Sequence, residues 1–296
     1  MHIIVGGTGH VGSATARSLL RRGEPVTIVT HHREHAADLA AEGAQVAVAD
    51  IHDVPALRDI LRSGTSAFLL NPPAEPSTDT DAVERANAAA IAAAVEGSGL
   101  RKVVAASTYG ARPGTPCGDL TVLFEFEEAL RARLGRVAVN RAAYYMSNWT
   151  GMLDAVAASG KLPSFFPADY ALPMVAPEDL GEAAARRLID ADDEPAIRYV
   201  EGPRRYTAGE VAAAMAEALG KRVKVDVVPR EQWTAAFRQM GFSERAAITY
   251  TCMTGTVLDE SDRWPADPVR GATTLEAYIR AAVQRWQEAK EASKNR

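Results

Sequence analysis

The chain begins Met1-His2-Ile3-Ile4-Val5-Gly6-Gly7-Thr8-Gly9-His10-Val11-Gly12, a short apolar run that enters a glycine-rich turn. A segment with the apolar spacing of a helix follows the turn. Strand, glycine turn and helix in this order form the arrangement that binds the pyrophosphate of a dinucleotide. The first glycine allows the tight turn, the second lets the backbone approach the phosphates, and the third lets the helix pack closely on the strand. The alternative is a tight strand-to-helix turn without a ligand.

The composition sets broad limits on the protein. The chain has 296 residues, 47% of them hydrophobic, which is enough for one large domain with a smaller lobe. Its formal net charge of −5 argues against a nucleic-acid-binding surface. No apolar run reaches the roughly 18 residues of a membrane span, and Met1 directly before a strand leaves no room for a signal peptide. We therefore expect a cytoplasmic protein without a nucleic-acid or membrane partner.

The two cysteines, Cys117 and Cys252, predict no disulfide framework, and no C-x-x-C metal motif is present. We therefore expect a reducing compartment and no metal site. Cys117 lies in a loop rich in proline and glycine, at 112–118. It could face the site on a mobile lid or be an ordinary loop thiol, and the second alternative is preferred.

Short apolar runs alternate with segments of helical spacing through the first half of the chain. The predicted strands are Ile3–Val5, Val26–Thr30, Val46–Ala49, Ala67–Leu70, Val103–Ala106 and Val137–Asn140. The predicted helices are Gly12–Arg22, Glu34–Glu42, Val54–Arg62, Thr80–Gly97 and Leu120–Leu134. Strands separated by helices indicate right-handed crossovers and a parallel sheet covered on both faces. We therefore predict an α/β protein, a Rossmann-type doubly wound parallel sheet with a smaller α-rich C-terminal lobe.

The alternation loosens after residue 150, where a passage rich in proline and phenylalanine begins. We place a dinucleotide-binding domain at 1–150 and a substrate-binding lobe at 151–296, with a helix near 177–190 packing back on the first domain. Within the lobe we predict a capping box at Thr207 and Glu210, a strand at 223–228, helices near 231–240 and 275–288, and a frayed polar tail at 290–296.

The end of the second predicted strand bears on the choice between NAD(H) and NADP(H). An acidic side chain there would bind a ribose 2′-hydroxyl, whereas a cation accommodates a 2′-phosphate. The chain reads Thr30-His31-His32-Arg33, with no acid before Glu34. Arg33, with a histidine, could pair with a phosphate, so NADP(H) is the preferred cofactor and NAD(H) the alternative. The competing interpretation is a solvated loop that only begins the next helix.

Polar and proline residues also end the third and fourth predicted strands. Asp50 and Ile51 could flank an adenine or form an end-of-strand turn. Asn71 and Pro72 could lie beside the nicotinamide half of the cofactor or form a rigid loop entry. These alternatives stay open at this point.

The fifth predicted strand ends at Ser107-Thr108-Tyr109-Gly110, at the sheet edge where ligands bind in α/β proteins. Ser107 could polarise a substrate carbonyl, and Tyr109 could donate a proton or fill the pocket wall. The usual Tyr-x-x-x-Lys pair of reductases is absent, because the chain has no lysine between Lys102 and Lys161.

Aromatic residues make up 6% of the chain, yet several gather between residues 144 and 166. They could line a flat apolar pocket for an aromatic or quinone-like substrate, or they could form a core that joins the lobes. Arg141, at the end of the sixth strand, could hold a phosphate or an acidic neighbour. The cluster consists of Tyr144, Tyr145, Trp149, Phe165 and Phe166.

Four passages together resemble the NmrA-like group of the atypical (extended) short-chain dehydrogenase/reductases. They are the glycine turn at 6–12, Asn71-Pro72-Pro73, the passage from Phe126-Glu127-Glu128 to Tyr144-Tyr145-Met146-Ser147-Asn148, and Val175-Ala176-Pro177-Glu178-Asp179-Leu180-Gly181. The resemblance runs through nearly the whole chain and is weakest beyond about residue 200. It lies near the branch of NADPH-dependent quinone and triphenylmethane-dye reductases. The group also contains isoflavone-reductase relatives and non-catalytic redox sensors.

The resemblance implies a set of cofactor contacts. The chain departs from the group in two ways: His31 stands where relatives often carry arginine, and the lysine of isoflavone-reductase relatives is missing. The implied pyrophosphate contacts are Gly6, Thr8, Gly9, His10, Val11 and Gly12. The implied contacts to the rest of the cofactor are His31 and Arg33 at the 2′-phosphate, Asp50 and Ile51 at the adenine, and Asn71, Pro72 and Ser107, with Thr108, near the nicotinamide.

From these features we expect an NADPH-dependent reductase of electron-poor aromatic or quinone-like small molecules. Such acceptors can take hydride without a strong general acid, so catalysis would rest largely on near-attack geometry. Ser107, Tyr109 and Tyr144 are the candidate catalytic residues. The alternative is a cofactor-binding redox sensor that regulates a protein partner. Either protein would be a monomer or a homodimer.

Overall fold

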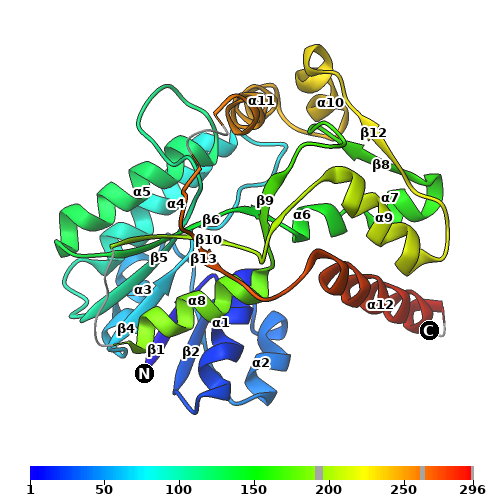
Figure 1. Ribbon diagram of the computed structural model, residues 1–296. Helices are drawn as coiled ribbons and strands as arrows, with labels where there is room; N and C mark the ends of the chain where they lie inside the picture. Colours follow the sequence, from blue (N-terminus) through cyan, green and yellow to red (C-terminus); the bar gives the residue numbers. More distant parts are fainter. Residues whose placement is uncertain (191–195, 261–263, 295–296) are drawn as a thin grey trace.

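The computed structural model describes residues 1–190, 196–260 and 264–294. An eight-stranded sheet with parallel pairing lies at its centre, in the order β3-β2-β1-β4-β5-β6-β10-β13 (Figure 1). The order reverses beside β1, where open α/β sheets bind their ligands at the carboxyl ends of the strands. The strands are β1 (His2–Val5), β2 (Val26–Thr30), β3 (Gln45–Val48), β4 (Ser66–Leu69), β5 (Lys102–Thr108), β6 (Ala138–Ala142), β10 (Ile197–Glu201) and β13 (Val269–Arg270).

Helices cover both faces of this sheet, each with its own apolar core. On one face, α3 (Val54–Arg62), α4 (Thr80–Val95) and α5 (Asp119–Leu134) bury residues such as Leu61, Ile91 and Phe126. On the other face lie α1 (His10–Arg21), the short α2 (Ala37–Ala41), which follows the 3-10 turn η1 (Arg33–Ala36), and α8 (Pro177–Ile189). The predicted doubly wound parallel sheet is therefore confirmed.

Helix α8 packs directly against α1. A Cβ atom at Gly181 would lie 2.5 Å from the carbonyl carbon of Ala14, so only glycine allows the two helices to approach this closely. The approach keeps α8 on the same sheet face as the helix that follows the glycine turn.

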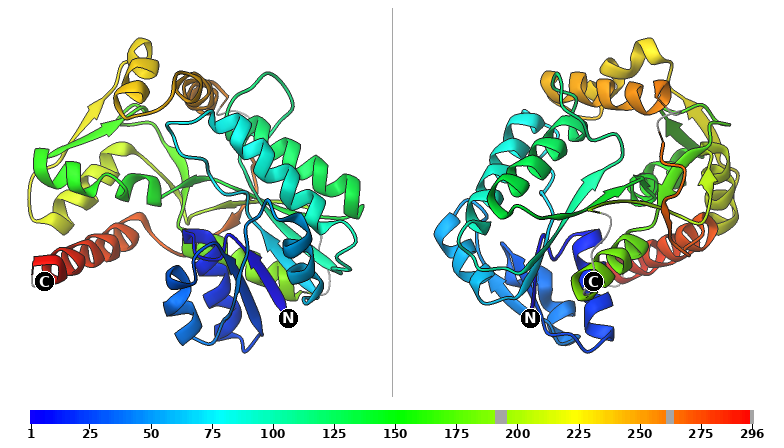
Figure 2. Two further views of the ribbon diagram at one scale, coloured as in Figure 1. Left: turned by 180° about the vertical axis from the view of Figure 1, so that it is seen from behind. Right: turned by 60° about the vertical axis from the view of Figure 1, so that its left-hand side comes forward.

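The remaining elements form a smaller α-rich unit beside the sheet (Figure 2). Its core contains Trp149, Leu162, Met174 and Tyr206, packed against the long last helix. The strands form a three-stranded sheet, β11-β9-β7, and a two-stranded sheet, β12-β8. These strands are β7 (Tyr144–Tyr145), β8 (Lys161–Ser164), β9 (Leu172–Val175), β11 (Arg205–Tyr206) and β12 (Lys224–Val227). The helices are α6 (Ser147–Thr150), α7 (Leu153–Ser159), α9 (Ala208–Leu219), the 3-10 turn η2 (Arg230–Gln232), α10 (Trp233–Gln239), α11 (Glu244–Asp259) and α12 (Leu275–Lys294).

Two features of this unit differ from the expectation. Helix α11 was not predicted, because four threonines, an isoleucine and a valine give its sequence a low helix propensity. Helix α12 continues through Lys294, so the predicted fraying of the tail is wrong up to that residue. Residues 295 and 296 lie outside the described part. The capping box at Thr207 and Glu210 is confirmed.

The chain returns to the large sheet after it has entered the smaller unit. Residues 177–189, 197–201 and 269–270 all belong to the sheet layers by their contacts. The predicted boundary at residue 150 stays a prediction, and we propose that these three segments be counted with the first domain. Within the three described ranges, none of the helices has the length and apolar character needed to cross a membrane.

Candidate active site

The glycine turn lies at the carboxyl end of β1, at the point where the strand order reverses. Gly6 has a positive φ of 74°, and the Gly9 N–H donates to the Gly6 carbonyl oxygen at 3.2 Å. A Cβ atom at Gly12 would lie 2.1 Å from that same oxygen, so this position admits only glycine. Thr8, Gly9 and His10 are exposed at the tip of the turn, while the strand before it is buried. The turn therefore presents open backbone to an incoming group.

Helix α1 starts directly behind this open backbone. Its N-cap is Gly9, no side chain caps it, and no acidic residue lies in its first turn. The partial positive charge of the helix end is therefore left for an external anion. Close glycine packing and an uncapped helix end together fit a bound pyrophosphate.

Two cavities adjoin the turn. One, of about 490 Å³, is lined by His10 and Ser13 of α1 and by Tyr278 and Trp286 of α12, among other residues. The other, of about 10 Å³, lies between Val11, Ser107 and Tyr145, among other residues. The start of α1 behind the turn, the end of β5 and β7 therefore meet at the second cavity.

The predicted 2′-phosphate residues lie exposed at the end of β2. His31 Nε2 is 4.0 Å from Asp50 Oδ1, and Arg33 donates to the Val46 carbonyl oxygen at 3.3 Å. Both side chains are accessible to a ligand. Asp50 accepts from the His52 N–H at 2.8 Å, as in the end-of-strand turn, and Ile51 is buried in the core.

The residues after β4 are tied to helix α4. Asn71 Nδ2 donates to the Glu84 carbonyl oxygen at 3.1 Å, and Asn87 Nδ2 donates to the Pro72 carbonyl oxygen at 3.2 Å. Asn71 is about nine-tenths buried, and its Oδ1 has no hydrogen-bond partner among the described residues. A buried acceptor without a donor at the sheet edge fits a ligand that carries an N–H group.

The Ser107 hydroxyl is not free, because it is hydrogen-bonded to a buried carboxylate. Its Oγ donates to Glu127 Oε1 at 2.5 Å, and the Glu127 carboxylate also accepts two hydrogen bonds of 2.9 Å from Arg141. Glu127 is fully buried and Arg141 is nearly so. Of the two roles considered for Arg141, the acidic neighbour is the one observed. Burial by itself lowers the pKa of the Arg141 guanidinium. The contacts with Glu127 outweigh this effect, so the pKa of Arg141 is raised.

The Tyr109 hydroxyl is also hydrogen-bonded to a carboxylate. Its hydroxyl donates to Glu201 at 3.2 Å, and its ring meets the Tyr199 ring edge-on at 5.2 Å. Burial, together with the charge of Glu201, raises the pKa of the Tyr109 phenol well above its usual range. These contacts favour the pocket-wall alternative for Tyr109 over proton donation. Thr108 is half-buried as the last residue of β5.

The aromatic cluster is distributed over several environments. Trp149 is only 1% exposed and lies with Phe166 in the core of the smaller unit, which is the packing alternative. Phe165 stacks on Phe237 at 4.3 Å in a separate cluster with α10. Tyr144 and Tyr145 are half-buried, and burial raises the pKa of Tyr144 to about 12.

A group of acidic side chains that the sequence analysis did not single out lies between α4, α5 and α11. Glu84 and Asp119 lie close enough to act on each other's pKa, and Asp81 acts on both. Burial, then the charge of Asp119, raises the pKa of Glu84 to about 8. No group of three or more histidine, cysteine and carboxylate side chains in the described residues could hold a metal ion. We refer to Glu84, Asp119 and Asp81 as the carboxyl cluster.

Cys117 and Cys252 form a disulfide, so the expectation of an ordinary loop thiol for Cys117 is wrong. Helix α11 lies beside α4 in both figures and brings Cys252 opposite the loop before α5, with the two Cα atoms 5.4 Å apart (Figures 1 and 2). The chain separation of 135 residues left no local signal for this pairing. Ser243, at the start of α11, adds hydrogen bonds to the carbonyl oxygens of Pro76 and Thr78.

Fold and glycine turn together define a Rossmann-type α/β protein built to bind a dinucleotide. The chain belongs to the NmrA-like family, whose model matches residues 2–280. The resemblance found in the sequence is thereby confirmed.

Two characterised relatives are similar over most of the chain. The NAD(P)H azoreductase of Xenophilus azovorans is 25% identical over 248 residues, covering 83% of this chain and 84% of that protein. Quinone oxidoreductase 2 of Escherichia coli (strain K12) is 25% identical over 258 residues, with the same coverage of 83% and 84%.

Solved structures show the same fold. The triphenylmethane reductase of Citrobacter sp. complexed with NADP(H) has a TM-score of 0.77 and 19% identity, covering 95% of this chain and 100% of that one. The NADPH-dependent quinone oxidoreductase QOR2 of Escherichia coli complexed with NADPH has a TM-score of 0.73 and 21% identity, covering 94% and 98%.

Proposed function

We propose that this protein is an NADPH-dependent reductase of electron-poor aromatic or quinone-like small molecules. The observation that carries the proposal is the exposed glycine turn in front of the uncapped helix α1, at the reversal point of the sheet. The azoreductase, the quinone oxidoreductase and the triphenylmethane reductase to which the chain is similar support the reductase class.

The chain's own residues would hold the cofactor by backbone and side-chain contacts. Gly6, Thr8, Gly9, His10, Val11 and Gly12 would bind the pyrophosphate, mainly through N–H groups of the turn. His31 and Arg33 would pair with the 2′-phosphate, Asp50 and Ile51 would flank the adenine, and Asn71, Pro72, Ser107 and Thr108 would flank the nicotinamide. When bound, NADPH supplies a hydride.

Ser107, Tyr109 and Tyr144 remain the candidate catalytic residues within this proposal. Because Ser107 is held by Glu127 and Tyr109 by Glu201, we expect the first two to fix the geometry of the site rather than to exchange protons. Tyr144 and Tyr145, which are half-buried, would border the substrate. Trp149 and Phe166 pack in the core of the smaller unit and Phe165 packs against α10, so the predicted pocket role of these three residues is not part of the proposal.

The test is direct. NADPH and NADH are mixed with the protein and a panel of quinones, azo dyes and cationic triphenylmethane dyes, and cofactor oxidation is followed by absorbance. We expect faster turnover with NADPH than with NADH, and turnover with at least one acceptor class. Absence of turnover with every acceptor would rule out the reductase.

The second candidate is a redox sensor that regulates a protein partner. The Cys117–Cys252 disulfide favours it, because a covalent link between α11 and the sheet domain could report oxidation. A sensor would bind NADP(H) tightly without turnover, and it would retain a partner in only one redox state in a pull-down. A cytoplasmic location and a monomeric or homodimeric state are part of both proposals. In a reducing compartment this disulfide would be open for much of the time.

A further inference from the structure

The larger cavity, of about 490 Å³, lies between α1 and α12 and extends away from the glycine turn. Its α1 wall consists of His10, Ser13, Ala14, Arg17 and Arg21, which run from the first residue of the helix to its last. Because a helix rises about 1.5 Å per residue, Arg21 lies roughly 16 Å along the axis from His10. Only the His10 end of the cavity therefore adjoins the proposed pyrophosphate site. Among the described residues that line the cavity, none is assigned to the adenine, the 2′-phosphate or the nicotinamide.

The wall opposite α1 contains two aromatic side chains of α12. Tyr278 is 6% exposed, and Trp286 is half-buried. The Trp286 Nε1 donates to Asp154 Oδ1 at 3.2 Å, and the Lys290 ammonium lies 4.3 Å from the centre of the Trp286 ring, so the indole is held in position. The buried apolar residue Leu153 of α7 completes this part of the lining. The cavity therefore offers a rigid apolar surface to a flat ring.

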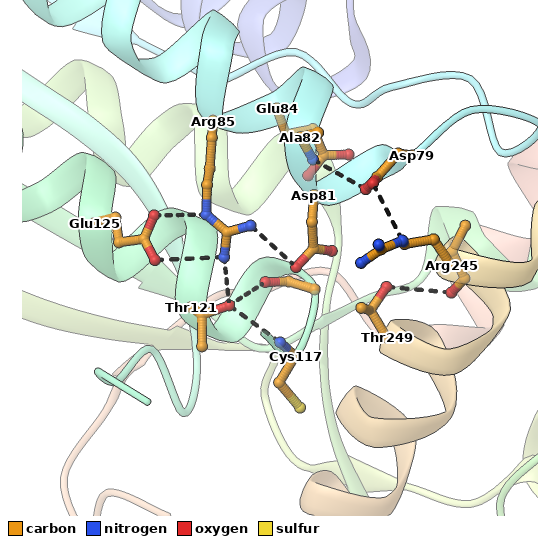
Figure 3. Close-up of polar contacts among 12 residues, drawn as sticks. Asp79, Asp81, Ala82, Glu84, Arg85, Cys117, Thr121, Glu125, Arg245 and Thr249 are labelled. Carbon is orange, nitrogen blue, oxygen red and sulfur yellow. Dashed lines mark hydrogen bonds and ion pairs between the residues drawn. The ribbon is translucent and has the colours of Figure 1, made fainter. Parts of the chain in front are cut away.

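The arginines near the carboxyl cluster show how this protein usually pairs its cations. Figure 3 shows Arg85 between Glu125 and Asp81, with Arg85 Nε 2.8 Å from Glu125 and Arg85 Nη1 3.5 Å from Asp81. Arg245 of α11 lies 3.8 Å from Asp79 at the start of α4 (Figure 3). The charge of each of these guanidinium groups is balanced by a carboxylate of the chain itself.

Two arginines of the larger cavity lack such a partner. Arg21 of α1 and Arg285 of α12 form no salt bridge and no hydrogen bond with any described part of the chain, and both are exposed. The third arginine of the lining, Arg17, pairs with Glu42 at 2.9 Å. The lining also contains one carboxylate, Glu178 of α8, so positive charge is in excess. Two unpaired guanidinium groups at one cavity favour a ligand that carries negative charge.

We propose that the cavity between α1 and α12 is a second ligand site, separate from the cofactor site, and that it binds a small aromatic anion. The ring of the ligand lies against Tyr278 and Trp286, and its carboxylate or sulfonate pairs with Arg21 and Arg285. The volume of about 490 Å³ lies within the range of about 300–1,000 Å³ that is typical of small-molecule sites. This inference does not depend on the proposed reductase function.

The first experiment tests whether the ligand needs both a ring and a negative charge. Isothermal titration calorimetry measures the binding of naphthoate, of the uncharged analogue naphthamide and of acetate, which has the charge without the ring. We expect one naphthoate per chain, bound at least about tenfold more tightly than either analogue. We expect the same naphthoate affinity with and without saturating NADPH, because the two ligands occupy different sites.

The second experiment locates the site with three variants. Arg21→Gln and Arg285→Gln should each weaken naphthoate binding at least about tenfold and leave the affinity for naphthamide unchanged, because each removes a charge and not the ring surface. Arg280→Gln is the matched control: it lies on α12 outside the cavity lining and pairs with Glu217 at 3.5 Å, so it should bind naphthoate as wild type does. All three arginines are exposed, and thermal unfolding verifies that the variants fold.

Several results would overturn the proposal. They are equal affinities for naphthoate and naphthamide, naphthoate binding that Arg21→Gln and Arg285→Gln leave unchanged, and displacement of naphthoate by NADPH. Absence of binding with naphthoate, benzoate and naphthalenesulfonate alike would also overturn it. None of these measurements uses hydride transfer, so their outcome is independent of the test of the reductase function.

Discussion

Ser107 Oγ lies 2.5 Å from Glu127 Oε1, and both side chains are buried behind the carboxyl edge of the sheet. The same carboxylate accepts from Arg141 of β6 and from Arg131, one helical turn further along α5. One buried carboxylate therefore links the end of β5, the neighbouring strand and a covering helix. This arrangement keeps the Ser107 hydroxyl in a single orientation beside the glycine turn.

The first prediction concerns this carboxylate. Glu127→Ala leaves the buried Arg141 guanidinium without its partner, so we expect the free energy of unfolding to fall by about 3–5 kcal/mol. The matched control is Glu128→Ala at the next position, where the exposed pair with Arg131 contributes less than about 1 kcal/mol. Urea denaturation measures both values. Equal losses in the two variants would contradict the prediction.

The second prediction concerns the glycine turn. Gly12→Ala places a methyl group 2.1 Å from the Gly6 carbonyl oxygen, so the turn must open and its N–H groups lose their alignment. We expect NADPH affinity to fall more than about tenfold, a loss of more than roughly 1.4 kcal/mol. Isothermal titration calorimetry measures the affinity. Gly151→Ala, whose new methyl group meets only ordinary contacts at 3.8 Å, should bind as wild type.

The third prediction concerns the role of Tyr109. The raised pKa of its phenol and the hydrogen bond to Glu201 make Tyr109 a poor proton donor. We therefore expect Tyr109→Phe to lower quinone kcat by less than about threefold, well below the roughly 100-fold that general acids contribute. Steady-state kinetics over about pH 6–9 measures the change in kcat. A loss of about 100-fold would identify Tyr109 as the proton donor.

The fourth prediction concerns stability and pH. Folding raises the pKa of Glu84 from 4.5 to about 8 through burial and then through the charge of Asp119. Between these values the folded state holds a proton that the unfolded state releases, so stability falls as the pH rises across that interval. Thermal unfolding at a series of pH values should show this decline, and the decline should be smaller in Glu84→Gln. Parallel curves for the two proteins would exclude the raised pKa of Glu84.

The fifth prediction concerns the disulfide. Cys117 and Cys252 close a loop of 135 residues, and cross-links of long loops typically stabilise the folded state by about 2–4 kcal/mol. We expect reduction of the protein, and Cys252→Ser, to lower the free energy of unfolding by that amount. Thiol titration before and after reduction verifies the state of the bond. An unchanged unfolding midpoint after complete reduction would contradict the prediction.

Local patterns were enough to predict the sheet and the turn. The glycines of the turn act within a few residues of one another, and the apolar strands β1 to β6 are separated by helices with clear spacing. The elements that were missed have weak local signals. Strand β13 has two residues, and the threonines of α11 disfavour the helix that packing then imposes.

The polar pairings of the site could not be predicted because they join distant segments. Glu84 resembles any acid near the start of a helix, and only the packing of α4 against α5 places it beside Asp119. Trp149 and Phe166 resembled pocket residues in the sequence, and the core of the smaller unit absorbs them. Burial of a side chain depends on the whole fold. A cluster of aromatic residues in the sequence therefore does not show whether these residues line a pocket or pack in a hydrophobic core.

The late return of the chain to the large sheet has a consequence for synthesis on the ribosome. Strand β6 pairs on one side with β5, but its other edge stays open until Ile197 has been made, and β10 in turn waits for Val269. A nascent chain that ends near residue 150 therefore carries an unpaired strand edge and lacks α8 over the α1 face. Such a chain is prone to aggregate, so the protein completes its folding only when nearly all of it has emerged.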